Sequence, residues 1–171
     1  MMAKIVFITG GQRSGKSSFA QNYALILSEK PIYLATSRVL DNDFAKRVER
    51  HKFDRDSRWE NIEEDLYIST RIENKRVVLI DCITLWLTNI ILDNGEDVEL
   101  SLSFAKNEID KIMKIDSTII IVSNEIGMGG HASNDLQRKF TDLQGFINQY
   151  IAVKSEEVYL MVSGINVKIK G

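Results

Sequence analysis

The fold of this chain is decided by the stretch Ile5-Val6-Phe7-Ile8-Thr9-Gly10-Gly11-Gln12-Arg13-Ser14-Gly15-Lys16-Ser17-Ser18. Here an apolar run gives way to glycines and then to a Lys-Ser pair. Residues 10–17 match the phosphate-binding pattern G-x-x-x-x-G-K-[ST]. The apolar run 5–8 predicts a buried strand, and the apolar spacing from Ser17 to Leu27 predicts a helix. The pattern therefore has the strand, loop and helix that it requires.

A loop of this kind binds phosphate mainly through its backbone. Its glycines let successive N–H groups point at phosphate oxygens, and the N-terminus of the following helix adds partial positive charge. Lys16 would reach the β- and γ-phosphates, and Ser17 would bind Mg²⁺. We therefore predict nucleotide contacts from all eight loop residues, which are Gly10, Gly11, Gln12, Arg13, Ser14, Gly15, Lys16 and Ser17.

Length and composition indicate an ordinary globular protein, with no sign of a nucleic-acid-binding surface or a membrane span. The 171 residues contain no linker, so we expect a single domain over 1–171. The net charge of −2 and the pI of about 5.8 predict no nucleic-acid surface. No apolar run reaches membrane-spanning length and no signal-peptide pattern is present, so a cytoplasmic location is expected. Cys82 is the only cysteine and is predicted to be a small buried thiol.

Three more apolar runs end in polar residues. Residues 31–34 lead to Ala35-Thr36-Ser37, 76–80 lead to Asp81, and 118–122 lead to Ser123-Asn124-Glu125 and a glycine-rich loop. Ligands of open α/β sheets lie outside the carboxyl ends of the strands, so these residues should face the phosphate loop. Asp81 is predicted to be the carboxylate for Mg²⁺. The alternatives are a Ser/Thr turn at 35–37 and a helix cap at Asp81.

A basic helix is expected after Asp41, which can serve as its N-cap. Its apolar face would leave Arg47 and His51 together on another side, four residues apart. Such a cluster near a phosphate site would hold a second anionic group or keep a histidine beside phosphorus. The alternative is a solvated helix face. The second histidine, His131, is predicted to be a solvated loop residue.

The remaining pattern predicts an α/β fold. We expect an edge strand at 59–62, a helix after Glu63 to Asp65, and helices at 83–92, 100–113 and 134–152. Leu136, Phe140, Leu143 and Ile147 should lie on the buried side of the last helix. Residues 157–162 and 165–169 predict a hairpin. Strands and helices thus alternate up to an antiparallel last strand, which favours a mostly parallel sheet covered on both faces.

Six motifs together give the chain a resemblance to a known family. It resembles the bifunctional adenosylcobinamide kinase/adenosylcobinamide-phosphate guanylyltransferases of cobalamin biosynthesis, nearly end to end. The phosphate loop alone is common to many ATPases, whereas the combination is far more specific. The motifs are Gly10 to Ser17, Tyr33-Leu34-Ala35-Thr36-Ser37, Arg47-Val48-Glu49-Arg50-His51-Lys52, Asn124-Glu125-Ile126-Gly127-Met128-Gly129, Phe140-Thr141-Asp142-Leu143-Gln144-Gly145 with Asn148-Gln149, and Ser163-Gly164 before Val167-Lys168-Ile169-Lys170.

The resemblance implies a RecA-like P-loop domain, a homotrimer and two reactions. A nucleoside triphosphate, ATP or GTP, phosphorylates the aminopropanol hydroxyl of adenosylcobinamide. GTP then gives GMP to an enzyme histidine, and the phosphorylated corrinoid takes it up as adenosyl-GDP-cobinamide. His51 matches the guanylylated histidine, with Lys16 as the other catalytic residue. Besides the loop, the residues that match nucleotide-contacting positions are Ala35, Thr36, Ser37, Lys52, Phe53, Asp54, Arg55, Glu63 and Asp81.

Two other functions fit the phosphate loop. One is a nucleotide-controlled switch or binding module, in which the bound nucleotide orders a partner surface. The other is a kinase that lacks the transferase activity. Neither forms a covalent nucleotide or needs His51, so a test for protein-bound GMP separates both from the bifunctional enzyme.

Overall fold

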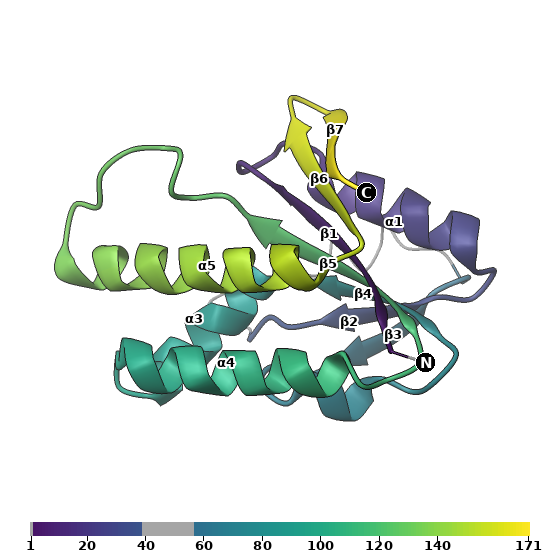
Figure 1. Ribbon diagram of the computed structural model, residues 1–171, viewed down its shortest axis with the longest axis horizontal. Coiled ribbons are helices and arrows are strands. Elements are labelled where there is room, and N and C mark those ends of the chain that lie inside the picture. Colours follow the sequence, from purple (N-terminus) through teal and green to yellow (C-terminus); the bar gives the residue numbers. More distant parts are fainter. Residues whose placement is uncertain (1, 39–56) are drawn as a thin grey trace.

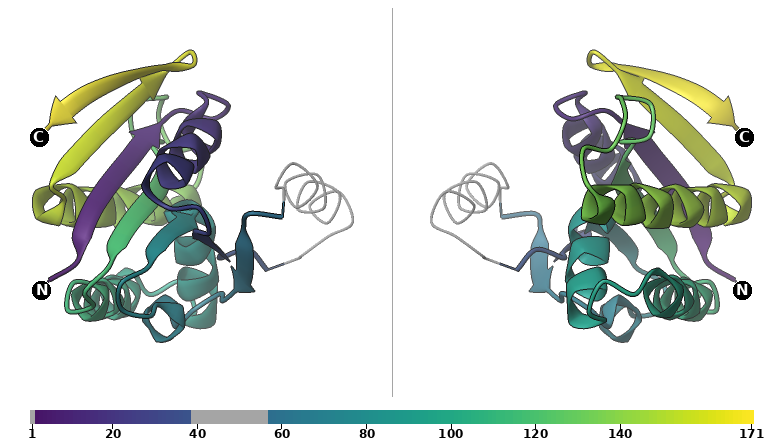
Figure 2. Two further views of the ribbon diagram at one scale, coloured as in Figure 1. Left: turned by 90° about the vertical axis from the view of Figure 1, so that its right-hand side faces the viewer. Right: turned by 90° about the vertical axis from the view of Figure 1, so that its left-hand side faces the viewer.

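The protein folds around a central sheet with helices on both faces (Figure 1). The computed structural model describes residues 2–38 and 57–171. Figure 2 shows the same arrangement from two further sides. The elements are β1 (Lys4–Gly10), α1 (Lys16–Leu27), β2 (Ile32–Ala35), β3 (Glu60–Glu63), the 3-10 helix η1 (Ile68–Arg71), β4 (Val77–Asp81), α3 (Ile83–Asp93), α4 (Val98–Ile112), β5 (Thr118–Asn124), α5 (Asp135–Lys154), β6 (Glu157–Val162) and β7 (Ile165–Lys170).

The sheet has the mostly parallel topology that the sequence predicts. Its seven strands lie in the order β3-β2-β4-β5-β1-β6-β7, and only the β6–β7 pair is antiparallel. Val122 of β5 is in register with Ile8 of β1 and with Asp81 of β4. The carboxyl ends of these strands therefore meet at one edge of the sheet, where the phosphate loop begins. This is the RecA-like α/β arrangement.

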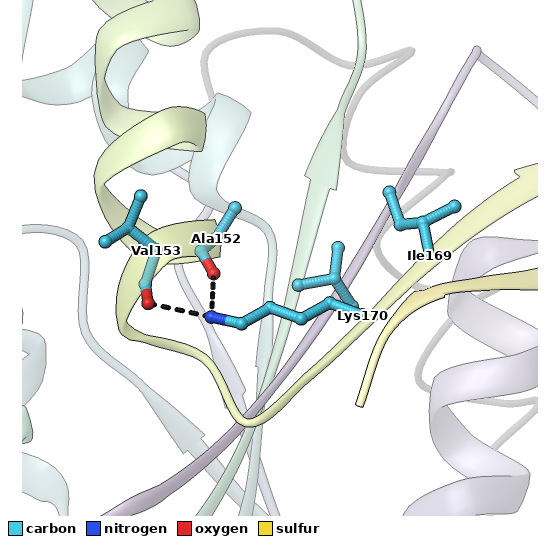
Figure 3. A pocket seen from close by; sticks show the side chains of 5 residues that line it. Ala152, Val153, Ile169 and Lys170 are labelled. Carbon is cyan, nitrogen blue, oxygen red and sulfur yellow. Dashed lines mark hydrogen bonds between the residues drawn. The ribbon is translucent and has the colours of Figure 1, made fainter.

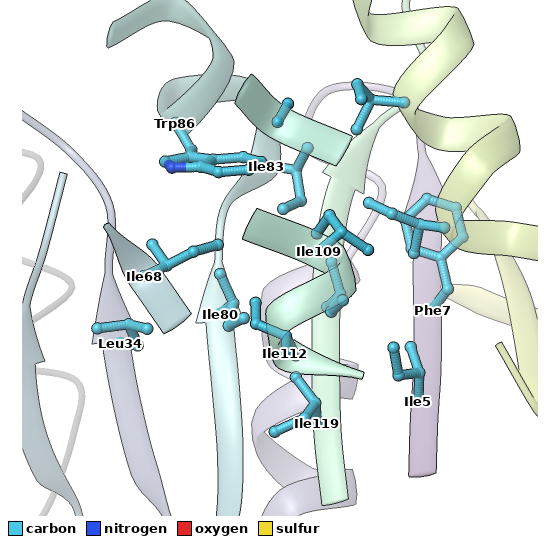
Figure 4. Close-up of a cluster of buried hydrophobic side chains, with 14 of the residues drawn as sticks. Ile5, Phe7, Leu34, Ile68, Ile80, Ile83, Trp86, Ile109, Ile112 and Ile119 are labelled. Atoms are coloured by element: carbon cyan, nitrogen blue, oxygen red, sulfur yellow. The ribbon is translucent and has the colours of Figure 1, made fainter. Parts of the chain in front are cut away.

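Apolar residues of β1 pack on both faces of the sheet, which explains its unbroken apolar run. Ile5 and Phe7 belong to the larger cluster, which α3, α4 and α5 cover (Figure 4). Val6 and Ile8 belong to the smaller cluster, which α1 covers through residues such as Ala20. Burial on both sides holds β1 rigidly and thereby fixes the start of the phosphate loop.

Two helices begin at side-chain caps. The carboxylate of Asp97 accepts a hydrogen bond from the backbone N–H of Leu100 at the start of α4. The side chain of Asn134 does the same for Gln137 at the start of α5, as expected for the residue that opens this helix.

Two details of the predicted helices are wrong. The helix expected after Asp65 is only the short 3-10 helix η1, where Glu64 accepts hydrogen bonds from the backbone N–H groups of Leu66 and Tyr67. Leu136, expected to be buried, is 39% exposed. The N-terminal end of α5 projects beyond the strands, so the first turn has no sheet to pack against (Figure 1). The helix expected from Asp41 lies outside the described residues.

Candidate active site

The phosphate loop connects β1 to α1, as predicted. Lys16, the first residue of α1, is only 7% exposed, and its ammonium lies over the loop. The Nζ atom donates a hydrogen bond to the Gly11 carbonyl at 2.6 Å and a longer one to Ser14 Oγ at 3.4 Å. Burial lowers the pKa of the Lys16 ammonium, and the negative charge of Asp81 opposes that shift. The Lys16 ammonium therefore lies buried at the loop, at the end of the sheet where β4 ends in Asp81.

Gly10 lies where no side chain fits. A Cβ atom at this position would be 2.5 Å from the backbone oxygen of Met161 in β6 and 2.9 Å from Ser14 Oγ. Its φ of 152° also disfavours a side chain. The first glycine of the loop is thus required by the close approach of β6 to the end of β1.

Asp81 ends β4, at the same edge of the sheet as the phosphate loop, and this position is the one predicted from the sequence. It is in register with Ala35 of β2, which in turn is in register with Glu63 of β3. The hydroxyl of Tyr33 donates a hydrogen bond to Asp81 Oδ2 at 2.7 Å, and Trp59 packs edge-on against the Tyr33 ring. The carboxylate therefore has a fixed orientation at the strand end, and the structure brings Asp81, Ala35 and Glu63 to one edge.

The Ala35-Thr36-Ser37 segment follows β2 at the same edge. Thr36 is fully buried, and its hydroxyl donates a hydrogen bond to the Cys82 carbonyl at 2.8 Å. The side-chain amide of Asn89 donates to the carbonyls of Thr36 and Asp65. The contacts of Thr36 thus connect the segment after β2 to the end of β4 and to α3. Its neighbours Ala35 and Ser37 are partly exposed.

A buried polar network beyond β5 was not assigned to the site from sequence. Gln144 of α5 is fully buried, and its Nε2 atom donates to Thr84 Oγ1 at 2.7 Å and to the Asn124 carbonyl at 2.8 Å. Asn148 donates to the same carbonyl at 3.0 Å and accepts from Ser123 Oγ at 2.7 Å. The sequence does contain one indication of this network, because Gln144 and Asn148 lie four residues apart on the apolar face of a helix.

This network fixes the end of β5 next to the start of α3. Thr84 follows Asp81 by three residues and also accepts a hydrogen bond from the backbone N–H of Asn124. The Thr84 hydroxyl therefore joins the segment that follows β4 to the end of β5. Within the described residues, two buried side-chain oxygens have no hydrogen-bond partner, Thr9 Oγ1 and Gln144 Oε1.

Neither Cys82 nor His131 has the surroundings of a nucleophile. Burial raises the pKa of the Cys82 thiol to about 12, although the residue is not fully covered. The thiol is therefore protonated at neutral pH. His131 lies exposed in the loop between β5 and α5, as predicted.

An apolar hollow lies away from the phosphate loop, between the C-terminal end of α5 and the hairpin (Figure 3). Its volume is about 370 Å³. Lys170 donates hydrogen bonds from Nζ to the carbonyls of Ala152 and Val153 at the end of α5. The Lys170 ammonium is the one charged group among the residues that line the hollow, and it is already paired with carbonyls at the end of α5. The hollow therefore does not suit a triphosphate. It is lined by Ala152, Val153, Val158, Ile169 and Lys170.

The second half of the predicted site lies outside the described residues. It comprises His51 and the residues predicted to contact nucleotide, Lys52, Phe53, Asp54 and Arg55. In the part of the chain that the structure covers, no helix is long and apolar enough to cross a lipid bilayer.

A buried loop lysine at the start of a helix and a carboxylate at the end of a neighbouring parallel strand define a P-loop nucleotide-binding protein. Comparison with known proteins narrows this class. A family model described as cobinamide kinase / cobinamide phosphate guanyltransferase matches residues 6–169. The chain therefore belongs to that family. It is a bifunctional cobinamide kinase and cobinamide-phosphate guanylyltransferase of cobalamin biosynthesis.

Individual relatives are similar over nearly their whole length. The bifunctional adenosylcobalamin biosynthesis protein CobU of Escherichia coli (strain K12) is 37% identical, over 97% of this chain and 99% of that protein. CobP of Pseudomonas aeruginosa, described in the same words, is 32% identical over 96% of each chain. The solved structure of PH0250 from Pyrococcus horikoshii OT3 has a TM-score of 0.53 at 9% identity and covers 98% of this chain and 86% of that one. This last likeness shows a shared fold alone.

Proposed function

We propose that the phosphate loop serves both reactions of this enzyme. In the first, a nucleoside triphosphate, ATP or GTP, phosphorylates the aminopropanol hydroxyl of adenosylcobinamide. The hydroxyl oxygen attacks the γ-phosphorus, the bond to the β-phosphate oxygen breaks, the hydroxyl proton is released to solvent, and the nucleoside diphosphate leaves. Lys16 stabilises the charge that develops on the phosphates. The observation that carries this proposal is the Lys16 ammonium, which is buried over the loop and donates a hydrogen bond to the Gly11 carbonyl.

In the second reaction, His51 carries GMP. A neutral imidazole nitrogen attacks the α-phosphorus of GTP, and the bond to pyrophosphate breaks, which gives a phosphoramidate. A phosphate oxygen of adenosylcobinamide phosphate then attacks the same phosphorus, and the P–N bond breaks to release adenosyl-GDP-cobinamide. Histidine suits this role because its pKa lies near neutrality, so that the nucleophilic form is available.

The proposed role of His51 is supported by Arg38, the residue that leads into the segment that contains it. Arg38, the last described residue before position 39, follows β2 at the carboxyl edge of the sheet. Its guanidinium forms two hydrogen bonds with Asp93 of α3, at 2.7 and 2.8 Å, and a further ion pair with Asp65. Arg38 is thus anchored at the same edge of the sheet as the phosphate loop, which supports a role at this site for the segment that follows it in the chain.

Mg²⁺ fits the oxygen donors at this edge. Ser17 offers a hydroxyl in the first turn of α1, and Asp81 offers a carboxylate that Tyr33 orients through Oδ2. Protein sites often hold Mg²⁺ by one or two such ligands together with substrate phosphates. Among the described residues no group of three His, Cys, Asp or Glu side chains is gathered for a metal, which suits a site shared with substrate. When bound, the ion would neutralise phosphate charge.

The same proposal covers the remaining contacts and the form of the enzyme. Ala35, Ser37 and Glu63 would contact nucleotide from the edge of the sheet, together with Lys52, Phe53, Asp54 and Arg55. Thr36, which was also predicted to contact nucleotide, is fully buried and would instead hold this edge in place. Residues 1–171 would act as one domain in a cytoplasmic homotrimer. These assignments rest on the match to family motifs and on the common edge at which Ala35, Glu63 and Asp81 lie.

The two reactions can be separated by following corrinoid products by chromatography. The wild-type enzyme, supplied with adenosylcobinamide, Mg²⁺ and GTP, should form the phosphate and then adenosyl-GDP-cobinamide. Lys16→Ala should lose both products, whereas His51→Ala should stop at the phosphate. His131→Ala is the matched control and should behave as wild type. Formation of adenosyl-GDP-cobinamide by His51→Ala at the wild-type rate would contradict the proposal.

A further inference from the structure

The turn of the C-terminal hairpin lies against the phosphate loop. Ser163 and Gly164 join β6 to β7, and both have positive φ, 50° and 85°. This is the geometry of a two-residue hairpin turn of type I′. The backbone N–H of Gly164 donates a hydrogen bond to the carbonyl of Ser14 at 2.9 Å. A Cβ atom on Gly15 would lie only 3.3 Å from the Gly164 Cα.

The hairpin is held firmly enough to act as a support. Glu157, at the start of β6, accepts hydrogen bonds from the hydroxyls of Tyr23 in α1 and Tyr159 in β6. It also forms ion pairs with Lys4 of β1 and Lys168 of β7, at 3.3 and 3.2 Å. The hairpin is thus fastened to the two elements that carry the phosphate loop. The turn of the hairpin therefore contacts the phosphate loop from a fixed position.

The contact at Ser14 determines which way a neighbouring N–H group points. A trans peptide is planar, and its C=O and N–H bonds point in opposite directions. Because the Ser14 carbonyl points toward the hairpin turn, the N–H of Gly15 in the same peptide points away from it. A phosphate loop works by directing its N–H groups toward bound phosphate.

We propose that Gly164 is a positioning residue for the phosphate loop. Its amide holds the Ser14–Gly15 peptide in the orientation in which the Gly15 N–H is directed at the triphosphate. This inference rests on the proposed function, because it requires the loop to bind the triphosphate of GTP. The C-terminal hairpin, which is far from the phosphate loop in the sequence, would thereby contribute to the affinity for GTP.

A matched pair of glycines allows a test. Gly164 and Gly95 both have positive φ, and at neither position would an added Cβ atom have another atom within 4 Å. Alanine at either position should therefore strain the backbone to a similar degree without a steric clash. Gly95 lies in the connection between α3 and α4, on the opposite face of the sheet from α1. Only Gly164→Ala should disturb the loop.

The measurement is the Kd for GTP by isothermal titration calorimetry, with urea unfolding of each variant alongside. We expect Gly164→Ala to weaken GTP binding about tenfold, the effect of misaligning one hydrogen bond to a charged group. Gly95→Ala should lose similar stability but keep the wild-type Kd. A backbone ester at position 164, which removes the N–H without changing the side chain, should also weaken binding. Gly164→Asn, which tolerates positive φ, should restore most of the affinity.

The outcomes distinguish this inference from the proposed function. If Gly164→Ala and the ester bind GTP as tightly as wild type, the positioning role is wrong and the phosphate loop keeps its function. The role is also wrong if Gly95→Ala weakens GTP binding as much as Gly164→Ala does. If Lys16→Ala binds GTP as wild type does, the loop is not the triphosphate site, and the proposed function fails as well.

Discussion

Replacing Gln144 by Leu should destabilise the protein without a large change in volume. The variant removes the donor that serves Thr84 Oγ1, Ser123 Oγ and the Asn124 carbonyl. Two of these acceptors keep another donor, because Asn148 still donates to the Asn124 carbonyl and the Asn124 N–H still donates to Thr84 Oγ1. The loss is therefore the net contribution of the hydrogen bonds, about 0.5–1.5 kcal/mol each, rather than the larger cost of unsatisfied acceptors. We expect a loss of about 2 kcal/mol of unfolding free energy.

The assay is urea unfolding followed by far-UV circular dichroism, with thermal unfolding as a second measure. For a chain of this length about 2 kcal/mol corresponds to a Tm lower by about 4–8 °C. Gln149→Leu is the matched control, since Gln149 lies on the same helix but is exposed. It should change the free energy of unfolding by less than about 0.5 kcal/mol. Equal stability of the two variants would refute the argument that the buried network fixes the end of β5.

Three further predictions concern single residues. Lys16→Ala should abolish phosphorylation of adenosylcobinamide in a chromatographic assay while the circular dichroism spectrum stays unchanged; substantial turnover would place the triphosphate elsewhere. Tyr33→Phe frees the Asp81 carboxylate to rotate, so a titration of activity against Mg²⁺ should shift to higher concentration, and an unshifted curve would separate Asp81 from the metal. Hydrogen bonding from Tyr159 lowers the pKa of Glu157 from 4.5 to about 2, so its contribution to stability is complete above about pH 4.5 and lost as the pH falls toward 2. Urea midpoints should therefore fall more steeply across this range for wild type than for Glu157→Gln, and parallel curves would contradict this.

Elements whose patterns are local were predictable from sequence. The run 5–8 is apolar at every position because both faces of β1 are covered, and the glycines that follow it define the loop without reference to the rest of the chain. The hairpin was predictable because Ser163-Gly164 separates two strand-like runs by two residues. The place of Asp81 at the edge of the sheet followed from the parallel topology.

Contacts between distant segments were not predictable in the same way. Tyr33 and Asp81 are 48 residues apart, and their hydrogen bond depends on the pairing of β2 with β4. Gln144 could have been noticed as a polar residue on an apolar helix face, but its partners are fixed only by the packing of α5 on β5 and α3. Leu136 matched the apolar spacing of α5 and is nevertheless exposed, because helical periodicity does not tell where the sheet ends.

The central claim, that GMP passes through a histidine of this chain, is tested most directly by mass spectrometry. The wild-type protein is incubated with GTP and Mg²⁺ without corrinoid, digested under alkaline conditions that preserve a phosphoramidate, and its peptides are mapped. We predict one GMP on the peptide that contains His51, and its loss when adenosylcobinamide phosphate is added. Absence of protein-bound GMP, or its attachment to His131, would contradict the account.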